Sequence, residues 1–169
     1  MNKYDIQDLV ILITGAAGQL GQATINAALR SGAKLVCLDL CLDALTEASL
    51  KNGWDDQVLL CPADIRNEKD IKAVLNLGLE RFGVIDALIN NAANMYRQPV
   101  DGYTEAHLTD AFNTNVISAM MLSSLAVPHL DATDGAIVFI GSTHTRRAFP
   151  GASPYATTKA ALEGLTKVM

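Results

Sequence analysis

Residues 9–21, LVILITGAAGQLG, join a short apolar run to a glycine-rich turn. The apolar run has no polar face, as a strand buried on both sides of a parallel sheet requires. Gly15, Gly18 and Gly21 let the backbone turn tightly and approach a pyrophosphate, and the helix expected from Gly18 would direct its N-terminal amides at that anion. The motif therefore favours a nucleotide-binding turn over an ordinary strand-to-helix turn.

Beyond this stretch, β-rich runs alternate with segments of helical periodicity. Strands are expected at residues 9–14, 34–39, 58–64, 86–90 and 136–140. Helices are expected at residues 18–30 and 42–51, after the N-cap residue Asn67, from Thr104 towards Pro128, and from Pro154 to the end of the chain. This alternation predicts an α/β, Rossmann-like doubly wound parallel sheet with strand order 3-2-1-4-5, and Pro62 favours an edge position for the third strand.

Length and composition predict one domain that spans residues 1–169. Half of the 169 residues are apolar and 18% are charged, which excludes a disordered chain. The net charge of −5 gives no reason to expect a nucleic-acid or membrane partner. No apolar run approaches the ~20 residues that cross a bilayer, and the first ten residues lack a signal-peptide core. We therefore expect a cytoplasmic protein.

Three cysteines, Cys37, Cys41 and Cys61, lie in apolar, strand-like surroundings. Their odd number and their setting predict reduced core thiols and not a disulfide framework or a zinc site. The sequence therefore predicts no metal site.

Two carboxylates end predicted strands on the side where this architecture gathers its ligands. Asp39 lies 18 residues after Gly21 and could accept hydrogen bonds from the adenosine ribose, while it would repel a 2′-phosphate. No Lys or Arg lies in the glycine loop or directly after Asp39, so NAD is favoured over NADP. Asp64 could reach the adenine edge or could cap a turn, and its spacing does not decide between the two.

Tyr155 and Lys159 are four residues apart in the last predicted helix, and therefore lie on one face of it. An ammonium beside a phenol stabilises the phenolate, which would make Tyr155 a usable acid and base. Ser142 follows the fifth predicted strand, where ligands gather. Asn115 is an amide on an otherwise apolar helix face, which is costly unless its polar atoms are satisfied. A structural role remains open for each of these residues taken singly.

Together these residues resemble the short-chain dehydrogenase/reductase family, in its single-domain branch, over essentially the whole chain. The matching segments are the 14–21 glycine loop, Asp39, Asp64-Ile65, Asn90-Asn91-Ala92-Ala93, Asn115, Ser142, Tyr155 and Lys159. The resemblance implies that NAD(H) exchanges hydride with a secondary alcohol or ketone through the catalytic residues Asn115, Ser142, Tyr155 and Lys159. It implies cofactor binding by Gly15, Gly18, Gln19, Leu20, Gly21, Asp39, Asp64, Ile65, Asn91, Ala92, Tyr155 and Lys159.

The resemblance also implies the division of labour within the site. Tyr155 would take the alcohol proton, Ser142 would hold the substrate oxygen, Lys159 would bind the ribose, and Asn115 would position a water beside Lys159. The long helix around Asn115 and the Tyr155 helix resemble the pair that builds a two-fold interface in the family, which implies a homodimer or homotetramer.

The chain departs from the usual family pattern in three places. Its loop reads TGxxGxxG, a spacing more typical of the extended branch of sugar-nucleotide epimerases and dehydratases, and NNAA replaces NNAG. The chain is also shorter than family members usually are and lacks their sixth and seventh strands, so we expect it to be the N-terminal two-thirds of a longer family domain. An extended-branch enzyme and a non-catalytic nucleotide-binding protein remain the alternative interpretations.

Overall fold

The computed structural model describes residues 5–147 and 149–169. Its strands are β1 (Val10–Thr14), β2 (Lys34–Asp39), β3 (Val58–Pro62), β4 (Ala87–Asn90) and β5 (Ala136–Phe139). Its α-helices are α1 (Gln19–Arg30), α2 (Leu42–Asn52), α3 (Glu68–Phe82), α4 (Glu105–Phe112), α5 (Ser118–Asp131) and α6 (Ser153–Thr166). Short helical turns are η1 (Val100–Gly102), η2 (Asn113–Ile117) and η3 (Thr143–Thr145).

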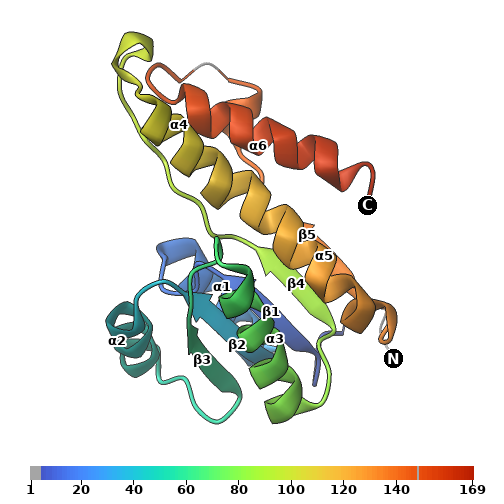
Figure 1. The fold of residues 1–169 in the computed structure, drawn as a ribbon. Helices are drawn as coiled ribbons and strands as arrows, with labels where there is room; N and C mark the ends of the chain where they lie inside the picture. The colour runs from blue at the N-terminus through green and yellow to red at the C-terminus, as the bar shows by residue number, and fades with distance from the viewer. Residues whose placement is uncertain (1–4, 148) are drawn as a thin grey trace.

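The five strands form one parallel sheet in the order β3-β2-β1-β4-β5 (Figure 1). This confirms the predicted fold class, including the edge position of the strand that contains Pro62. Because all strands are parallel, their carboxyl ends meet at one edge of the sheet, and the order reverses between β1 and β4. That edge is where the predicted cofactor residues collect.

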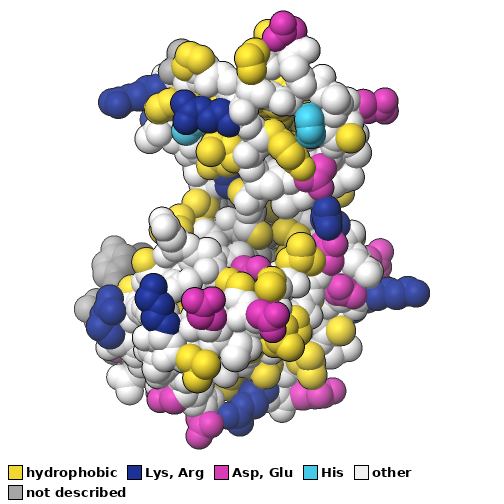
Figure 2. Space-filling view, turned by 90° about the vertical axis from the view of Figure 1, so that its left-hand side faces the viewer, with side chains coloured by type: hydrophobic (Ala, Val, Ile, Leu, Met, Phe, Trp, Pro, Cys, Tyr) yellow, Lys and Arg dark blue, Asp and Glu magenta, His cyan; other side chains and the backbone are white. Residues whose placement is uncertain are grey.

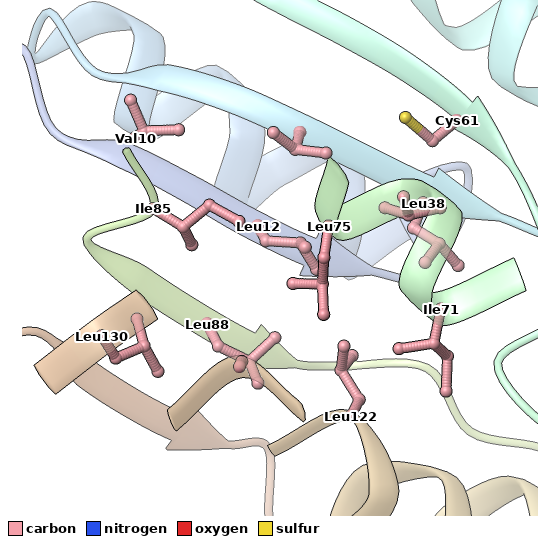
Figure 3. Packing of buried hydrophobic residues seen from close by; sticks show 13 residues of the cluster. Val10, Leu12, Leu38, Cys61, Ile71, Leu75, Ile85, Leu88, Leu122 and Leu130 are labelled. Atoms are coloured by element: carbon pink, nitrogen blue, oxygen red, sulfur yellow. The ribbon is translucent and has the colours of Figure 1, made fainter. Parts of the chain in front are cut away.

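Two apolar clusters fix the helices on opposite faces of the sheet. One joins alternate residues of β1 and β2 to Ile71 and Leu75 of α3 and to Leu122 of α5 (Figure 3). The other joins Ile11 and Ile13 of β1 and Leu35 and Cys37 of β2 to Ile25 of α1 and Leu45 of α2. Burial on both faces accounts for the unbroken apolar runs of β1 and β2.

The long helix predicted from Thr104 towards Pro128 is present, but it is not one uninterrupted α-helix. It is interrupted by the π-helical turn η2, in which one extra residue per turn shifts the faces of α4 and α5 relative to each other. It also continues past Pro128 to Asp131, where the proline costs one hydrogen bond near the helix end. Beside this long helix lies α6, which contacts both α4 and η2 (Figure 1).

The prediction that all three cysteines are core thiols also needs correction. Cys37 and Cys61 are buried free thiols, but Cys41 is exposed because β2 ends at Asp39 and Cys41 is the N-cap residue of α2. Asn67 caps α3 as predicted, and its side chain accepts a hydrogen bond from the backbone of Lys69. The carboxylate of Asp70, at the third position of this helix, accepts a hydrogen bond from the backbone N–H of Asp64.

Within the described part of the chain, no helix combines the length and the apolar character needed to span a membrane.

Candidate functional site

A cleft of about 750 Å³ opens at the carboxyl ends of the strands. Every residue predicted to bind the cofactor lines it: Gly15, Gly18, Gln19, Leu20, Gly21, Asp39, Asp64, Ile65, Asn91, Ala92, Tyr155 and Lys159. The space-filling view shows a waist in the molecule, with a hollow between an upper and a lower lobe (Figure 2). Of the four catalytic candidates, Tyr155 and Lys159 are among the described residues that line the cleft. Ser142 and Asn115 are not among them.

The glycine loop is shaped by two close backbone approaches. Gly15 has φ +66, and a Cβ there would lie 2.9 Å from the Cα of Ala92. A Cβ on Gly21 would lie 2.2 Å from the carbonyl oxygen of Gly15, so any side chain would push α1 away from the loop. Gly18 differs, since its φ is −69 and its nearest neighbour to a Cβ, at 3.3 Å, is that same oxygen.

The N-terminus of α1 faces the cleft without a side-chain cap. Its N-cap residue is Gly18, and no acidic residue lies in its first turn. The first amides of a helix have no intrahelical partner, and together with the dipole they favour an anion. Gln19 and Leu20, which carry such amides, line the cleft.

Asp39 is held at the rim of the cleft by the backbone around it. Its Oδ2 accepts a hydrogen bond from the N–H of Ala17 in the glycine loop at 2.9 Å, and its Oδ1 accepts one from the N–H of Leu40 at 2.8 Å. The carboxylate therefore stands between the loop and the end of β2, at the cleft wall. A ligand phosphate at this place would meet a fixed negative charge.

The end of β4 is locked to the end of β1. The hydroxyl of Thr14 accepts hydrogen bonds from the backbone N–H groups of Asn91 and Ala92, and the Asn91 amide donates to the carbonyl oxygens of Thr14 and Gly15. Asn91 thus supplies hydrogen-bond partners for the end of β1 and for the glycine loop, and it fixes the positions of β1 and β4 at the switch point of the sheet. An amide suits this place because its NH₂ group can donate to two carbonyl oxygens.

Asn115 is 1% exposed and lies in the π-helical turn η2. Its Oδ1 accepts from the N–H of Asn94, and its Nδ2 donates to the carbonyl oxygen of Asn94 and to the hydroxyl of Thr158. The amide therefore ties the loop after β4 to α6, in the turn beside Tyr155. These bonds give Asn115 the satisfied partners that its burial requires.

Tyr155 and Lys159 lie on one face of α6, as their spacing predicts. The Nζ of Lys159 is 5.7 Å from the centroid of the Tyr155 ring and donates a 2.7 Å hydrogen bond to the carbonyl oxygen of Ile140, directly after β5. The residue is 1% exposed. Burial lowers the pKa of Lys159 to about 8, because a desolvated ammonium is disfavoured.

Ser142 is the N-cap residue of η3, and both hydrogen-bonding partners of its side chain belong to His144. Its Oγ accepts a hydrogen bond from the N–H of His144 and lies 3.1 Å from the Nδ1 of that ring. The His144 ring stacks on Phe149 at a centroid distance of 3.9 Å and meets the Tyr155 ring edge-on at 5.2 Å. The imidazole of His144 thus contacts both Ser142 and Tyr155.

The residues of the cleft lining that the sequence did not single out include two of opposite charge, Arg66 and Asp110. Arg66 forms ion pairs with Asp64 at 2.7 Å and with Asp110 at 2.8 Å. The partners Arg66 and Asp110 are far apart in sequence, and neither lies in a recognised motif. The one sequence signal for this ion-pair cluster was the position of Arg66 directly after the Asp64-Ile65 segment.

A parallel α/β sheet with a glycine loop at its switch point and a Tyr–Lys pair across the same cleft defines a Rossmann-like oxidoreductase architecture. The model of the short chain dehydrogenase family matches residues 9–169, and the chain belongs to this family.

Similar proteins of known description support this membership. The chain is 31% identical to ipsdienol dehydrogenase of Ips pini over 95% of the chain and 67% of that protein. It is 32% identical to 2-(R)-hydroxypropyl-CoM dehydrogenase of Xanthobacter autotrophicus over 94% of the chain and 66% of that protein. The structure of 3-ketoacyl-(acyl-carrier-protein) reductase from Brucella melitensis, complexed with NADH, matches with a TM-score of 0.90 at 25% identity, over 96% of this chain and 69% of that one. The chain thus spans about two thirds of the length of these proteins.

Proposed function

We propose that this chain forms the cofactor-binding part of an oxidoreductase that transfers hydride between NAD(H) and a secondary alcohol or ketone. One observation carries the proposal: Tyr155 and Lys159 line the same cleft as the glycine loop and Asp39. A site for a nucleotide and a site for proton transfer thereby share one cleft. The names of the relatives and the NADH complex of the structural neighbour support the same reaction class.

The residues of the cleft fit a nicotinamide dinucleotide. The uncapped N-terminus of α1 and the side-chain-free Gly18 suit a pyrophosphate, and Asp39 suits the adenosine ribose hydroxyls. The two cations among the described lining residues are Arg66, which is paired with two carboxylates, and Lys159, which is buried. Both cations are engaged by other groups of the protein, Arg66 by the two carboxylates and Lys159 by the carbonyl oxygen of Ile140, so we propose a preference for NAD over NADP.

The dinucleotide, when bound, supplies the hydride acceptor or donor. In the oxidising direction the Tyr155 oxygen takes the alcohol proton while Ser142 donates a hydrogen bond to the substrate oxygen, like a one-donor oxyanion site. Lys159 stabilises the phenolate by its charge and binds the nicotinamide ribose. Asn115 positions this machinery through Thr158 and the loop after β4, and it would hold a water beside Lys159.

The relatives favour oxidation and reduction over the sugar-nucleotide chemistry that the TGxxGxxG spacing leaves open. Both relatives named above are dehydrogenases and the structural neighbour is a reductase. The spacing itself has a local structural basis, since Gly15 and Gly21 are required by close backbone contacts, whereas a Cβ on Gly18 would meet only the Gly15 oxygen, at 3.3 Å.

Fluorescence titration of the chain with NADH and NADPH tests the proposal. The wild-type chain should bind NADH more tightly than NADPH by at least about tenfold, because a phosphate beside a carboxylate costs more than about 1.4 kcal/mol. Asp39→Asn should reduce this preference, since it removes the charge but keeps an acceptor for the Ala17 N–H.

Asp43→Asn is the matched control, because it removes one negative charge from the exposed first turn of α2, outside the cleft lining. It should leave the preference unchanged. Equal affinities for the two cofactors in the wild-type chain, or a preference for NADPH, would reject the assignment of Asp39. Absence of binding to either cofactor would reject the proposed function.

A further inference from the structure

Four side chains outside the cleft form a hydrogen-bond relay that ends on the glycine loop. The indole N–H of Trp54 donates to Asn26 Oδ1 at 2.7 Å, and Asn26 Nδ2 donates to Asn52 Oδ1 at 2.7 Å. Asn52 Nδ2 donates in turn to Gln22 Oε1 at 3.1 Å, and Gln22 Nε2 donates to the carbonyl oxygen of Ala17 at 2.6 Å. Each amide therefore accepts from one neighbour and donates to the next.

The relay has one direction because its two ends have opposite chemistry. An indole N–H can only donate and a backbone carbonyl oxygen can only accept, whereas a side-chain amide can turn and present either its oxygen or its NH₂ group. The Trp54 donor decides that Asn26 presents its oxygen, and this choice passes through Asn52 to Gln22. In a series of this kind each hydrogen bond also polarises the next. The orientation of the Gln22 amide is thus set by Trp54, which is buried.

The packing of α1 and α2 brings the members of the relay together. Gln22 and Asn26 are four residues apart on α1 and share one of its faces. Asn52 is the last residue of α2, and its Nδ2 also donates to a carbonyl oxygen of that helix. Gly53 follows with φ +66, the left-handed conformation that ends the helix. Trp54 then enters the apolar cluster that joins both helices to the sheet, so the core fixes the donor end of the relay.

Ala17 is the residue through which the relay reaches the cleft. Ala17 and Asp39 both line the cleft, whereas none of the four relay members is among its described lining residues. Gln22 holds the carbonyl oxygen of Ala17, and the N–H of Ala17 donates to Asp39 Oδ2 at 2.9 Å. A loop residue that is held at both polar groups leaves the Asp39 carboxylate little freedom to turn away. A carboxylate that cannot move repels a 2′-phosphate more strongly than one that can.

We propose that Trp54, Asn26, Asn52 and Gln22 are positioning residues for cofactor discrimination, because their relay holds Ala17 and thereby keeps the Asp39 carboxylate where a 2′-phosphate would meet it. The inference rests on the proposed function and adds to it residues outside the cleft that set the preference for NAD. None of the four contacts the cofactor itself.

The test is titration of the full chain with NADH and with NADPH, and the quantity followed is the ratio of the two dissociation constants. Gln22→Met keeps the length of the side chain and removes the donor to Ala17. It should weaken NADH about three- to tenfold, as the loss of one constraining hydrogen bond implies. NADPH should change by less than about twofold, because a carboxylate that can turn aside opposes the phosphate less. The preference for NADH should therefore narrow.

Asn26→Asp tests the direction of the relay without changing the loop. The new carboxylate still accepts from Trp54, but it has no proton to donate to Asn52. The Asn52 amide must then turn its NH₂ group to the carboxylate, and Gln22 must turn its oxygen towards the oxygen of Ala17. This variant should narrow the preference as Gln22→Met does. In the Gln22→Met background it should change the ratio by less than about twofold, because the link to Ala17 is already cut.

Asn76→Asp is the matched control, since it makes the same change of charge at an exposed position of α3, outside the described cleft lining. It should leave both affinities unchanged. An unchanged ratio in Gln22→Met or in Asn26→Asp would overturn the proposal. Equal weakening of both cofactors would overturn it as well, as general damage to the loop, and so would full additivity in the double variant. A wild-type chain that binds no NADH would refute the proposed function itself, and this inference with it.

Discussion

Burial of the Lys159 ammonium makes the stability of the fold depend on pH in a predictable direction. The pKa of Lys159 falls from an ordinary value of 10.5 to about 8 in the folded chain. Between these two values the unfolded chain binds a proton that the folded chain has released, so the free energy of unfolding rises with pH. Below pH 8 both states are protonated and the fold bears the full cost of the buried charge.

The size of the effect follows from the shift. A change of one pKa unit corresponds to about 1.4 kcal/mol, so the lowered pKa corresponds to about 3 kcal/mol in total. About 2–3 kcal/mol of this should be recovered between pH 7 and pH 10, since the unfolded-state lysine is still partly protonated at pH 10. Lys159→Met, with an uncharged side chain of similar length, should not show this rise.

The assay is urea unfolding of both proteins at several pH values from 7 to 10, followed by the fluorescence of Trp54, the only tryptophan. The quantity compared is the wild-type free energy of unfolding minus that of Lys159→Met. This difference cancels the opposite contribution of Cys37 and Cys61, whose burial raises their thiol pKa values and destabilises the fold above about pH 9.

The difference should move in favour of the wild type by about 2–3 kcal/mol over this range. A difference that stays flat within about 0.5 kcal/mol would refute the reasoning, because it would mean that the ammonium keeps its hydration in the folded chain. A difference that falls with pH would contradict even the sign.

Three further outcomes are expected. Gly21→Ala should destabilise the fold by about 2 kcal/mol or more in the same unfolding assay, because its Cβ would lie 2.2 Å from the Gly15 oxygen. Gly18→Ala, whose Cβ would lie 3.3 Å from that oxygen, should destabilise the fold less and should mainly weaken the binding of NADH in a titration. Tyr155→Phe should lower kcat by about 10²–10⁴-fold on any alcohol that the enzyme oxidises while NADH affinity persists, and unchanged turnover would contradict its role as the base. Sedimentation should show a homodimer or homotetramer. Phe112→Glu, at an exposed apolar position of α4, should shift the equilibrium towards monomer, and a wild-type chain that stays monomeric at high concentration would refute the assembly.

Strand positions and the Tyr155–Lys159 pair could be predicted because both depend on local periodicity. Strand β2 is buried on both faces, so its apolar run marked its bounds, and a spacing of four residues puts two side chains on one helix face. The glycine loop was similarly readable, since close backbone approach at Gly15 and Gly21 leaves glycine as the one residue that fits.

The π-helical turn at Asn115 and the exposure of Cys41 had no such local signal. An extra residue in a helical turn does not alter the composition around it, and tertiary bonds from Asn115 to Asn94 and Thr158 hold it in place. Cys41 has the apolar neighbours Leu40 and Leu42, which suggested a core position, yet both are exposed after the end of β2.

The ion pairs of Arg66 with Asp64 and Asp110 depend on a contact between distant parts of the chain. Its partner Asp110 lies 44 residues further along the chain, on α4. The position of α4 is set by its packing against η2 and α6. Periodicity carries no information about such pairs. A position directly after a recognised strand-end carboxylate is the only sequence feature that could have pointed to Arg66.

The central claim, that the cleft at the strand ends holds NAD(H), is tested most directly by amide chemical shifts of the labelled chain during titration with NADH. The largest changes should fall on Gly18, Gln19 and Leu20 at the N-terminus of α1, which line the cleft. Gly53 and Asp55, in a separate hollow between α1 and α2, should not move. Shifts confined to that second hollow, or none at saturating NADH, would contradict the account.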